Sequence, residues 1–252
     1  MSKAAVVTGA SSGIGLEIAR ALLELSYTVY GIARDYGKAG LSDDRFIPFP
    51  CDVTDIAMLA ETAENVRRTI RSRGERLHVL VNNAGVGYFG PHEQLTPAQI
   101  AAMVDTNLKA PLILAQRFLR DIKQSQGFII NISSVTAKKS STHGCAYAAT
   151  KAALTHFGVS LFDEIRKTGA KVINIHPDMT RTPFYERADF REGDDPLSFL
   201  TPECVADAVK TALSQREGTV ITDITIRPQK HQITRKSPPK PSSRREDGHS
   251  PD

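Results

Sequence analysis

The sequence predicts an α/β domain in which seven parallel strands form one doubly wound sheet with helices on both faces. Short apolar runs typical of buried strands alternate along the chain with helical segments of ten or more residues, a pattern that requires crossover connections. Glycine or polar residues follow these runs, at the edge where parallel sheets bind ligands. The 252 residues, 40% of them hydrophobic, suffice for one such domain with a substantial core.

A glycine-rich turn separates the first strand, which ends at Thr8, from the helix that follows. The turn has the sequence Gly9-Ala10-Ser11-Ser12-Gly13-Ile14-Gly15. A helix that begins at such a turn directs backbone N–H groups at a pyrophosphate, and the glycines allow backbone and cofactor to approach closely. The spacing differs from the usual G-x-G-x-x-G fingerprint, so a turn and helix cap without a ligand is the alternative interpretation.

The residue after the second strand, residues 28–33, indicates which dinucleotide binds. Arg34 stands where a dinucleotide-binding fold faces the adenosine ribose. A basic residue there accommodates the 2′-phosphate of NADP, whereas an acidic residue binds the 2′-hydroxyl of NAD. Arg34 therefore predicts NADP, with NAD the less favoured cofactor. Asp35 would take the ribose position if the loop were shifted by one residue, and an ordinary exposed strand-end arginine is the other alternative.

The third and fourth strands also end in polar residues. Residues 46–50 run into Cys51-Asp52-Val53, a charge-rich helix follows over 56–71, and residues 78–81 run into Asn82-Asn83-Ala84-Gly85. Because the carboxyl ends of parallel strands meet at one edge of a sheet, we expect Asp52 and Asn83 to converge there with the glycine turn.

A long helical segment over residues 96–123 begins with Pro97, which suits the first turn of a helix. Pro111 inside it should kink or break the helix. Asn107 lies just before that break, where disturbed helix geometry could free backbone groups to bind water. An ordinary polar helix residue is the alternative for Asn107.

The last three strands are predicted at residues 127–132, 171–176 and 220–226, with a helix at 202–213. Ser133 and Ser134 follow the first of these strands, and Pro177 follows the second. An irregular, aromatic-rich stretch over residues 183–200 suits a lid over a site at this edge.

Tyr147 and Lys151 are four residues apart, so on a helix they project from one face about one turn apart. A nearby positive charge lowers the pKa of a phenol from its ordinary value of about 10. Such a tyrosine can donate a proton to a carbonyl oxygen or take one from an alcohol. An exposed Tyr and Lys on a helix surface are the common alternative for an isolated pair.

The ordered set of motifs resembles the short-chain dehydrogenase/reductase family over about residues 3–226. The matching segments are T-G-x-x-x-G-I-G at 8–15, D-V at 52–53, N-N-A-G at 82–85, Asn107, Ser133-Ser134, and Y-x-x-x-K at 147–151. The resemblance implies a single Rossmann-type domain, which we predict to span residues 1–232.

The resemblance also implies roles for individual residues. Tyr147 would be the general acid/base, and Lys151 would lower its pKa and hold the nicotinamide ribose. Ser134, rather than Ser133, would hydrogen-bond the substrate oxygen, and Asn107 would hold a water in the proton relay. The cofactor-binding residues would be Gly9, Ser11, Ser12, Gly13, Ile14, Gly15, Arg34, Asp52, Val53, Asn83, Ala84, Gly85, Tyr147, Lys151, Pro177, Thr180 and Thr182.

Three positions depart from the family pattern. Asp178 follows Pro177 where many members have glycine, which could place a carboxylate near the substrate. Members that prefer NADP often carry a basic residue where this chain has Ser12, so Arg34 stands alone. The glycine-rich end of tetrameric members is replaced by Arg227-Pro228-Gln229-Lys230. We therefore do not expect the usual tetramer, whereas a homodimer built on paired helices stays open.

Charge and composition bear on partners and location. Of the 32 basic and 28 acidic residues, seven and three lie in residues 227–252, which leaves 25 of each sign in residues 1–226. The body therefore carries no basic signature for nucleic acid, and no apolar run approaches the ~20 residues that span a bilayer. Residues 233–252 are basic and rich in Pro and Ser, which predicts a disordered tail, either solubilising or polyanion-binding. Three scattered cysteines and the lack of a signal-peptide pattern predict a reduced, cytoplasmic protein without a metal site.

The sequence thus predicts an oxidoreductase that uses NADP to interconvert a carbonyl and a secondary alcohol by hydride transfer, with a Ser-Tyr-Lys-Asn proton relay. The alternative is a dinucleotide-binding sensor or scaffold that keeps the fold without turnover. Residues 86–91, 135–144 and 183–200 should shape the pocket. Their side chains favour a partly apolar small molecule and include Tyr88, Phe89, His143, Phe184 and Tyr185.

Overall fold

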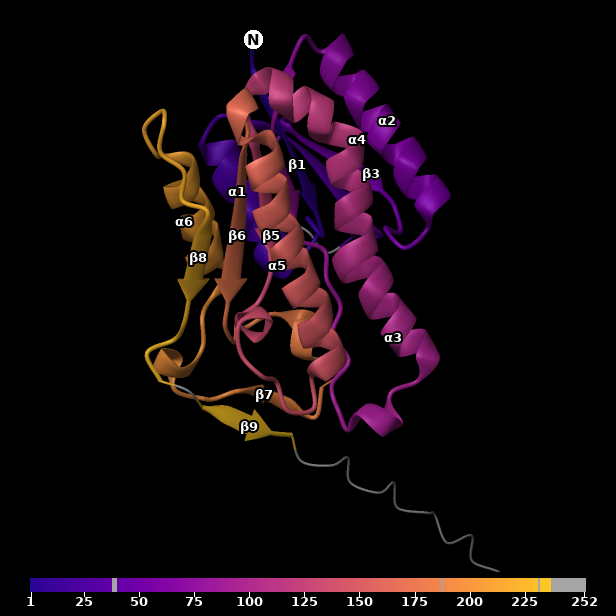
Figure 1. Cartoon of the computed structure of the whole chain (residues 1–252), viewed down its shortest axis with the longest axis vertical. Helices are drawn as coiled ribbons and strands as arrows, with labels where there is room; N and C mark the ends of the chain where they lie inside the picture. The colour runs from indigo at the N-terminus through magenta and orange to yellow at the C-terminus, as the bar shows by residue number, and fades with distance from the viewer. Residues whose placement is uncertain (38–39, 187, 231, 237–252) are drawn as a thin grey trace, which may run out of the picture.

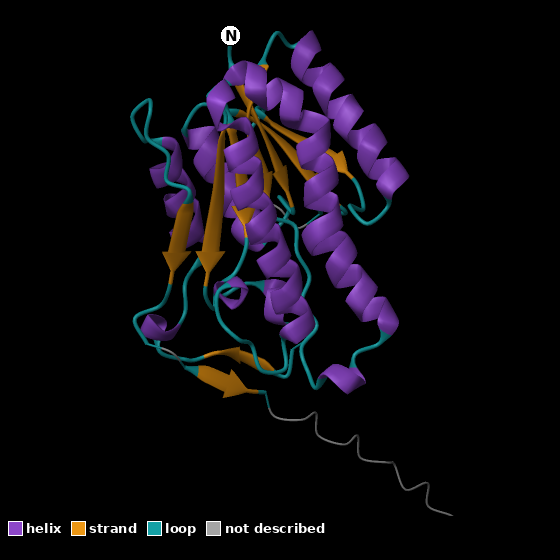
Figure 2. Cartoon of the chain, viewed as in Figure 1, coloured by secondary structure: helices purple, strands orange, loops and turns teal. Residues whose placement is uncertain are grey.

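Seven parallel strands form the centre of the protein, in the order β3-β2-β1-β4-β5-β6-β8. The computed structural model describes residues 1–37, 40–186, 188–230 and 232–236. Helices lie on both faces of the sheet (Figures 1 and 2). The predicted fold class is confirmed: a doubly wound, Rossmann-type sheet in which every neighbouring pair of strands is parallel.

The element boundaries agree with the predicted ones to within a few residues. The strands of the sheet are β1 (Lys3–Thr8), β2 (Thr28–Ala33), β3 (Phe46–Pro50), β4 (Arg76–Asn82), β5 (Phe128–Ile132), β6 (Lys171–Pro177) and β8 (Asp223–Ile226). The α-helices are α1 (Gly13–Glu24), α2 (Ile56–Ser72), α3 (Pro97–Val104), α4 (Ala110–Ser125), α5 (Cys145–Ile165) and α6 (Pro202–Leu213). Short 3₁₀ turns are η1 (His92–Gln94), η3 (Val135–Ala137), η4 (Arg166–Thr168), η5 (Pro183–Tyr185) and η6 (Pro196–Ser198).

Two hydrophobic cores lie on opposite faces of the sheet, because successive side chains of a strand point to opposite sides. Val6 belongs to the core under α2, α4 and α5, where Phe118 is fully buried. Val7, the next residue, belongs to the core under α1 and α6, with Leu22. Since both faces are covered, the strands are nearly continuous apolar runs. Buried asparagines are an exception: Asn131 bonds Asn82 at 2.9 Å and Asn174 at 3.1 Å across the sheet.

The helical segment before β5 is interrupted, as Pro111 predicts. A π-helical stretch, η2 (Asp105–Lys109), separates α3 from α4, and Asn107 lies at its centre. Pro111 has no N–H to donate to the carbonyl four residues earlier, which is that of Asn107. The disturbance expected from Pro111 takes the form of this π-helical stretch, whereas the backbone stays helical at both of its ends. The local geometry leaves the Asn107 carbonyl without its α-helical donor.

A second, two-stranded sheet lies beyond the carboxyl ends of the main strands (Figure 1). In it β7 (Phe190–Glu192) pairs antiparallel with β9 (Ile233–Arg235). The predicted start of a disordered tail at residue 233 therefore needs correction, because backbone pairing with β7 orders residues 233–235. The rest of the predicted tail, residues 237–252, lies outside the described residues.

Candidate active site

The glycine turn after β1 leaves no room for side chains at the start of α1. Gly9 and Gly13 have φ of 67° and 53°, the left-handed region that favours glycine. A Cβ added to Gly15 would lie 2.2 Å from the Gly9 carbonyl oxygen and 2.4 Å from Nδ2 of Asn83. The turn therefore needs glycine for its backbone path and for the close contact of α1 with the end of β4. Ser11, Ser12 and Ile14 lie within this turn and the first residues of α1.

Asn83 stabilises the glycine turn from the end of β4. Its Nδ2 donates to the Thr8 carbonyl at 2.8 Å, and the Thr8 hydroxyl accepts from the backbone N–H groups of Asn83 and Ala84, both at 3.0 Å. Thr8 is a site residue that the sequence analysis did not single out, although it opens the T-G-x-x-x-G motif. In this structure Asn83 holds the glycine turn in place through these hydrogen bonds. Its predicted contact with the cofactor stays a prediction.

Arg34 and Asp52 lie at the same edge, after β2 and β3. The Asp52 carboxylate accepts from the backbone N–H and the hydroxyl of Thr54, at 3.0 and 2.8 Å. These bonds and the nearby Arg34 guanidinium hold the Asp52 pKa below its ordinary value. Asp35 instead accepts from the Gly37 N–H at 2.9 Å, so its carboxylate is engaged in a local turn. Arg34 is exposed and presents a positive charge at this edge.

Tyr147 and Lys151 are buried, with exposed fractions of 7% and 4%. The alternative of an exposed pair on a helix surface is therefore wrong. Burial raises the pKa of Tyr147 to about 12, and a hydrogen bond with Ser134 acts in the opposite direction. Burial lowers the pKa of Lys151 to about 8. The Lys151 Nζ lies 5.8 Å from the centre of the tyrosine ring, and the expectation that it lowers the Tyr147 pKa stays a prediction.

Asn107 links the loop after β4 to α5. Its Oδ1 accepts from the Val86 N–H at 2.8 Å, and its Nδ2 donates to the Val86 carbonyl at 2.9 Å and to the Thr150 hydroxyl at 3.1 Å. The side chain is fully buried, which argues against an ordinary exposed helix residue. A Cβ on Gly85 would lie 3.5 Å from both Asn107 Oδ1 and Lys151 Nζ. The N-N-A-G segment therefore meets Asn107 and Lys151 at one place.

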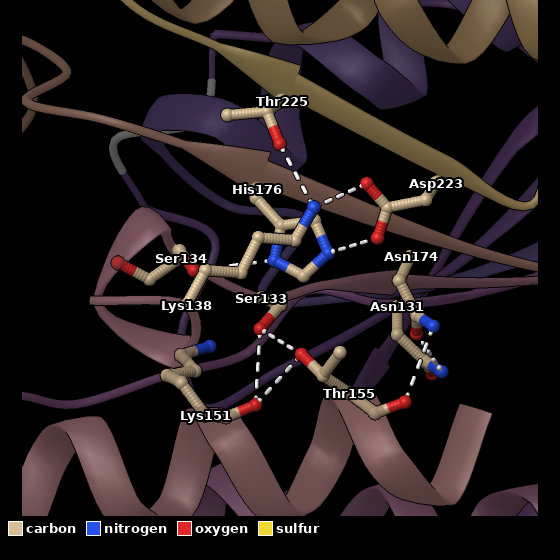
Figure 3. A network of polar contacts seen from close by, with 10 residues as sticks. All are labelled: Asn131, Ser133, Ser134, Lys138, Lys151, Thr155, Asn174, His176, Asp223 and Thr225. Carbon is tan, nitrogen blue, oxygen red and sulfur yellow. Dashed lines mark hydrogen bonds and ion pairs between the residues drawn. The ribbon is translucent and has the colours of Figure 1, made fainter. Parts of the chain in front are cut away.

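The two serines after β5 differ in their partners (Figure 3). The Ser133 hydroxyl lies 3.1 Å from the Lys151 carbonyl and 2.7 Å from the Thr155 hydroxyl, so it ties β5 to α5. The Ser134 hydroxyl accepts from the Thr136 N–H at 3.2 Å, and its side chain acts on the neighbouring Tyr147 to lower the pKa of the phenol. This arrangement supports Ser134, rather than Ser133, as the serine that faces a substrate.

A buried histidine lies behind Ser134 (Figure 3). The Nδ1 of His176 lies 3.2 Å from the Ser134 carbonyl, and its Nε2 lies 2.8 Å from Oδ2 of Asp223. Lys138 binds both Asp223 and the Thr225 hydroxyl. Burial holds the pKa of His176 below its ordinary value, although Asp223 acts in the opposite direction. The sequence analysis missed His176, since its neighbours are close only in the fold.

Thr182, from the segment after β6, meets the glycine turn. A Cβ on Gly13 would lie 3.2 Å from Cγ2 of Thr182. Thr180 is buried, and its hydroxyl donates to the Asp178 carbonyl at 2.9 Å, which shapes the chain just after Pro177. The structure thus brings the start of the predicted lid to the helix end that was predicted to bind a pyrophosphate.

Comparison with known proteins agrees with this geometry. A family model described as short chain dehydrogenase matches residues 3–192. The chain belongs to the short-chain dehydrogenase family. An "uncharacterized oxidoreductase" of Staphylococcus epidermidis is 33% identical over 228 residues, which cover 90% of this chain and 97% of that protein. The similarity to the family that the motifs predicted is confirmed.

Solved structures of other short-chain dehydrogenases have the same fold. A metagenomic short-chain oxidoreductase in complex with NADP is 33% identical, with a TM-score of 0.73 over 90% of this chain and 97% of that one. An alcohol dehydrogenase of the archaeon Thermococcus sibiricus, complexed with 5-hydroxy-NADP, has a TM-score of 0.80 at 24% identity, over 92% of this chain and 99% of that one. At that identity the second likeness concerns the fold alone.

This short-chain dehydrogenase thus holds a neutral phenol, a serine hydroxyl and a buried amine at the carboxyl edge of its sheet, next to a glycine turn. Such a set can hydrogen-bond an oxygen and exchange a proton with it. In the described part of the chain, no helix is long and apolar enough to cross a membrane. The comparisons show the family and its oxidoreductase class. The substrate and the roles of single residues stay proposals.

Proposed function

We propose that this short-chain dehydrogenase uses NADP to interconvert a small-molecule carbonyl compound and a secondary alcohol. The observation that carries the proposal is the burial of Ser134, Tyr147 and Lys151 at one place, where the Ser134 side chain acts to lower the Tyr147 pKa and Lys151 lies one helical turn away. Two hydroxyl groups that meet in a buried place can hold the same substrate oxygen.

The glycine turn and its surroundings fit a dinucleotide. The N-cap residue Ser12 makes no side-chain capping bond to the first N–H groups of α1, and a pyrophosphate could bind them. Arg34 supplies the charge that a 2′-phosphate requires. The related metagenomic enzyme described in complex with NADP supports this choice over NAD. When bound, the cofactor would supply or accept the hydride.

The protein's own residues would handle the proton. Because burial keeps the pKa of Tyr147 near 12, its phenol is protonated at neutral pH and can donate to a carbonyl oxygen. Ser134 would donate a second hydrogen bond to that oxygen. Lys151 and Asn107 are both buried and could form a relay that returns a proton to the phenol. A protonated phenol is the form of Tyr147 that the reduction would use.

Oxidation of NADPH with a panel of aldehydes and ketones tests the proposal. We expect Tyr147→Phe to lower kcat about 100-fold or more, which is the scale of general acid catalysis. Tyr27→Phe is the matched control, since Tyr27 is also buried but bonds His78, 2.8 Å away. Undiminished turnover in Tyr147→Phe would refute the role of the phenol. NADPH binding without turnover of any carbonyl would favour the sensor or scaffold.

We also infer a reducing, cytoplasmic location for the enzyme. Cys51, Cys145 and Cys204 are all free thiols, and Cys145 is exposed. An oxidising compartment would leave such a thiol open to disulfide exchange. A homodimer built on paired helices stays a prediction, and light scattering of the purified protein would test it.

A further inference from the structure

Four aromatic side chains form a cluster beside Tyr147, and two of them pair directly with its ring. Phe89 and Phe184 lie with ring centres 5.4 and 5.7 Å from that of Tyr147. Tyr185 and Phe190 continue the packing, at 6.0 and 5.2 Å from Phe89. We call Phe89, Phe184, Tyr185 and Phe190 the aromatic group. None of the four belongs to either core of the sheet, so the fold does not need them to cover a strand.

Glycine backbone keeps the space around these rings free of side chains. A Cβ on Gly87 would lie 2.7 Å from Cε2 of Phe89 and 2.8 Å from Cζ of Phe184. A Cβ on Gly144, just before α5, would lie 3.3 Å from Cδ1 of Phe89. The rings therefore rest against bare backbone on two sides. A substrate near Tyr147 would meet the faces and edges of these rings and not branched aliphatic side chains.

The angles between the rings favour aromatic partners. Phe89 meets Phe184 and Phe190 at interplanar angles of 71° and 73°, both edge-to-face. Aromatic pairs prefer such arrangements at centre distances of about 4.5–7 Å, because the positive edge of one ring faces the negative face of the other. A saturated ring of the same size fills similar volume but offers neither a face nor a polarised edge.

The surroundings of the aromatic group disfavour an anion. Burial, Tyr147 and the carboxylates of Asp178 and Glu192 all raise the pKa of the Tyr185 phenol above its ordinary value. Both carboxylates are paired with cations, Glu192 with Arg181 at 2.7 Å and Asp178 with Lys139 at 3.8 Å. A substrate carboxylate packed among the rings of the aromatic group would therefore be disfavoured mainly because it would lose its hydration.

We propose that the substrate is a neutral aryl ketone or aldehyde, or the matching aryl carbinol, whose ring packs in the aromatic group. This rests on the proposed function, because the carbonyl oxygen must meet Tyr147 and Ser134. In the reduction, the carbonyl carbon accepts a hydride from NADPH and the oxygen accepts the phenol proton of Tyr147. One NADPH and one solvent proton are consumed for each alcohol formed, and NADP⁺ is released.

Two matched pairs of substrates test the inference. Acetophenone and cyclohexyl methyl ketone differ in the aromaticity of the ring, and methyl benzoylformate and benzoylformate differ in charge. We expect kcat/KM to favour the aromatic and the neutral member by about 10-fold each, the scale of one or two ring contacts or one unfavourable charge. Since intrinsic reactivity also separates the members of a pair, the decisive quantity is how each ratio changes in variants.

Phe89→Leu should lower the acetophenone preference about fivefold, because Phe89 touches the other three members of the aromatic group. Phe162→Leu is the control: Phe162 is half-buried on the same helix as Tyr147, and its ring lies 5.7 Å from the Arg166 guanidinium. That variant should keep the ratio within about twofold. If Phe89→Leu does not fold, Phe184→Leu takes its place, and thermal melting checks both.

The two proposals fail in different ways. The aryl inference would be overturned if the ratio of kcat/KM values within each substrate pair were the same in the unmodified protein, Phe89→Leu and Phe162→Leu. Carbonyl reduction would still stand. If no carbonyl compound supports the oxidation of NADPH, the proposed function fails. Saturation-transfer NMR of acetophenone then decides the aryl inference. Signals from the acetophenone ring should weaken in Phe89→Leu but not in Phe162→Leu, and an unchanged or absent signal would overturn it.

Discussion

The ammonium of Lys151 donates a hydrogen bond to the carbonyl of Ile132 at 2.8 Å, where β5 ends. The bond holds the lysine against the sheet and leaves the amine almost fully buried. A buried ammonium loses hydration, which is why its pKa falls to about 8 from an ordinary value near 10.5. The folded protein thus carries a destabilised charge at the place where the proposed chemistry needs one.

Lys151→Met should expose this cost as a pH-dependent difference in stability. Below pH 8 the lysine is protonated in both the folded and the unfolded state, so the penalty is complete. Between pH 8 and 10.5 the folded protein binds fewer protons than the unfolded chain, and its stability rises with pH. The stability of Lys151→Met relative to the unmodified protein should therefore fall by up to about 3 kcal/mol across that window. Thermal melts of both proteins measure it, and a difference that does not change with pH would contradict the burial of a charged lysine.

Ser133→Ala and Ser134→Ala should have opposite effects on stability and turnover. Ser133 bonds the Lys151 carbonyl and Thr155, so its loss should cost about 1 kcal/mol of stability and leave kcat within a few-fold. Ser134 lies beside Tyr147, and its loss should lower kcat about 100-fold with a nearly unchanged melting temperature. Melting curves and NADPH-linked kinetics separate the two effects. The reverse pattern would make Ser133 the serine that meets the substrate.

Sequence reasoning succeeded where one residue's own chemistry decides the local structure. Pro111 lacks an N–H and therefore interrupts the helix at Asn107, and Gly9 and Gly13 take up backbone angles that other residues avoid. It failed where the outcome depends on residues far apart in the chain. The spacing of Tyr147 and Lys151 predicts a shared helix face. Only the packing of α5 on the sheet determines that both side chains are buried.

The second sheet is a further case of this kind. Three residues of β9, in a region that is polar and rich in Lys and Pro, form a strand because β7 offers them backbone partners. His176 likewise gains its position behind Ser134 from Asp223, a residue 47 positions later in the chain. Composition and periodicity describe segments one at a time, so they miss pairings that no segment encodes by itself.

Gly15→Ala should prevent cofactor binding and reduce stability. The added methyl group would lie 2.2 Å from the Gly9 carbonyl oxygen, backbone that cannot move without opening the turn. Overpacking of this kind costs about 1–3 kcal/mol. Gly37→Ala is the control, because its methyl group would meet the Asp35 carboxylate at 3.4 Å, an ordinary contact. Titration of NADPH fluorescence with each variant measures the binding, and tight binding by Gly15→Ala would show that the turn is not tuned for a dinucleotide.

Removing β9 should loosen the segment over residues 183–200, which carries three of the four residues of the aromatic group. The Lys236 ammonium donates to the carbonyls of Tyr185 and Glu186 at 2.7 and 2.9 Å. The backbone N–H of Lys236 donates to the Asp189 carbonyl at 2.7 Å. A chain that ends at residue 232 loses these bonds and the pairing with β7, whereas a chain that ends at residue 236 keeps them and serves as the control for loss of the charged tail. We expect the shorter chain to show a KM for carbonyl substrates about 10-fold higher, the effect of one or two net hydrogen bonds, and faster proteolysis within residues 183–200. Equal KM values and equal cleavage rates for the two chains would mean that β9 does not hold this segment in place.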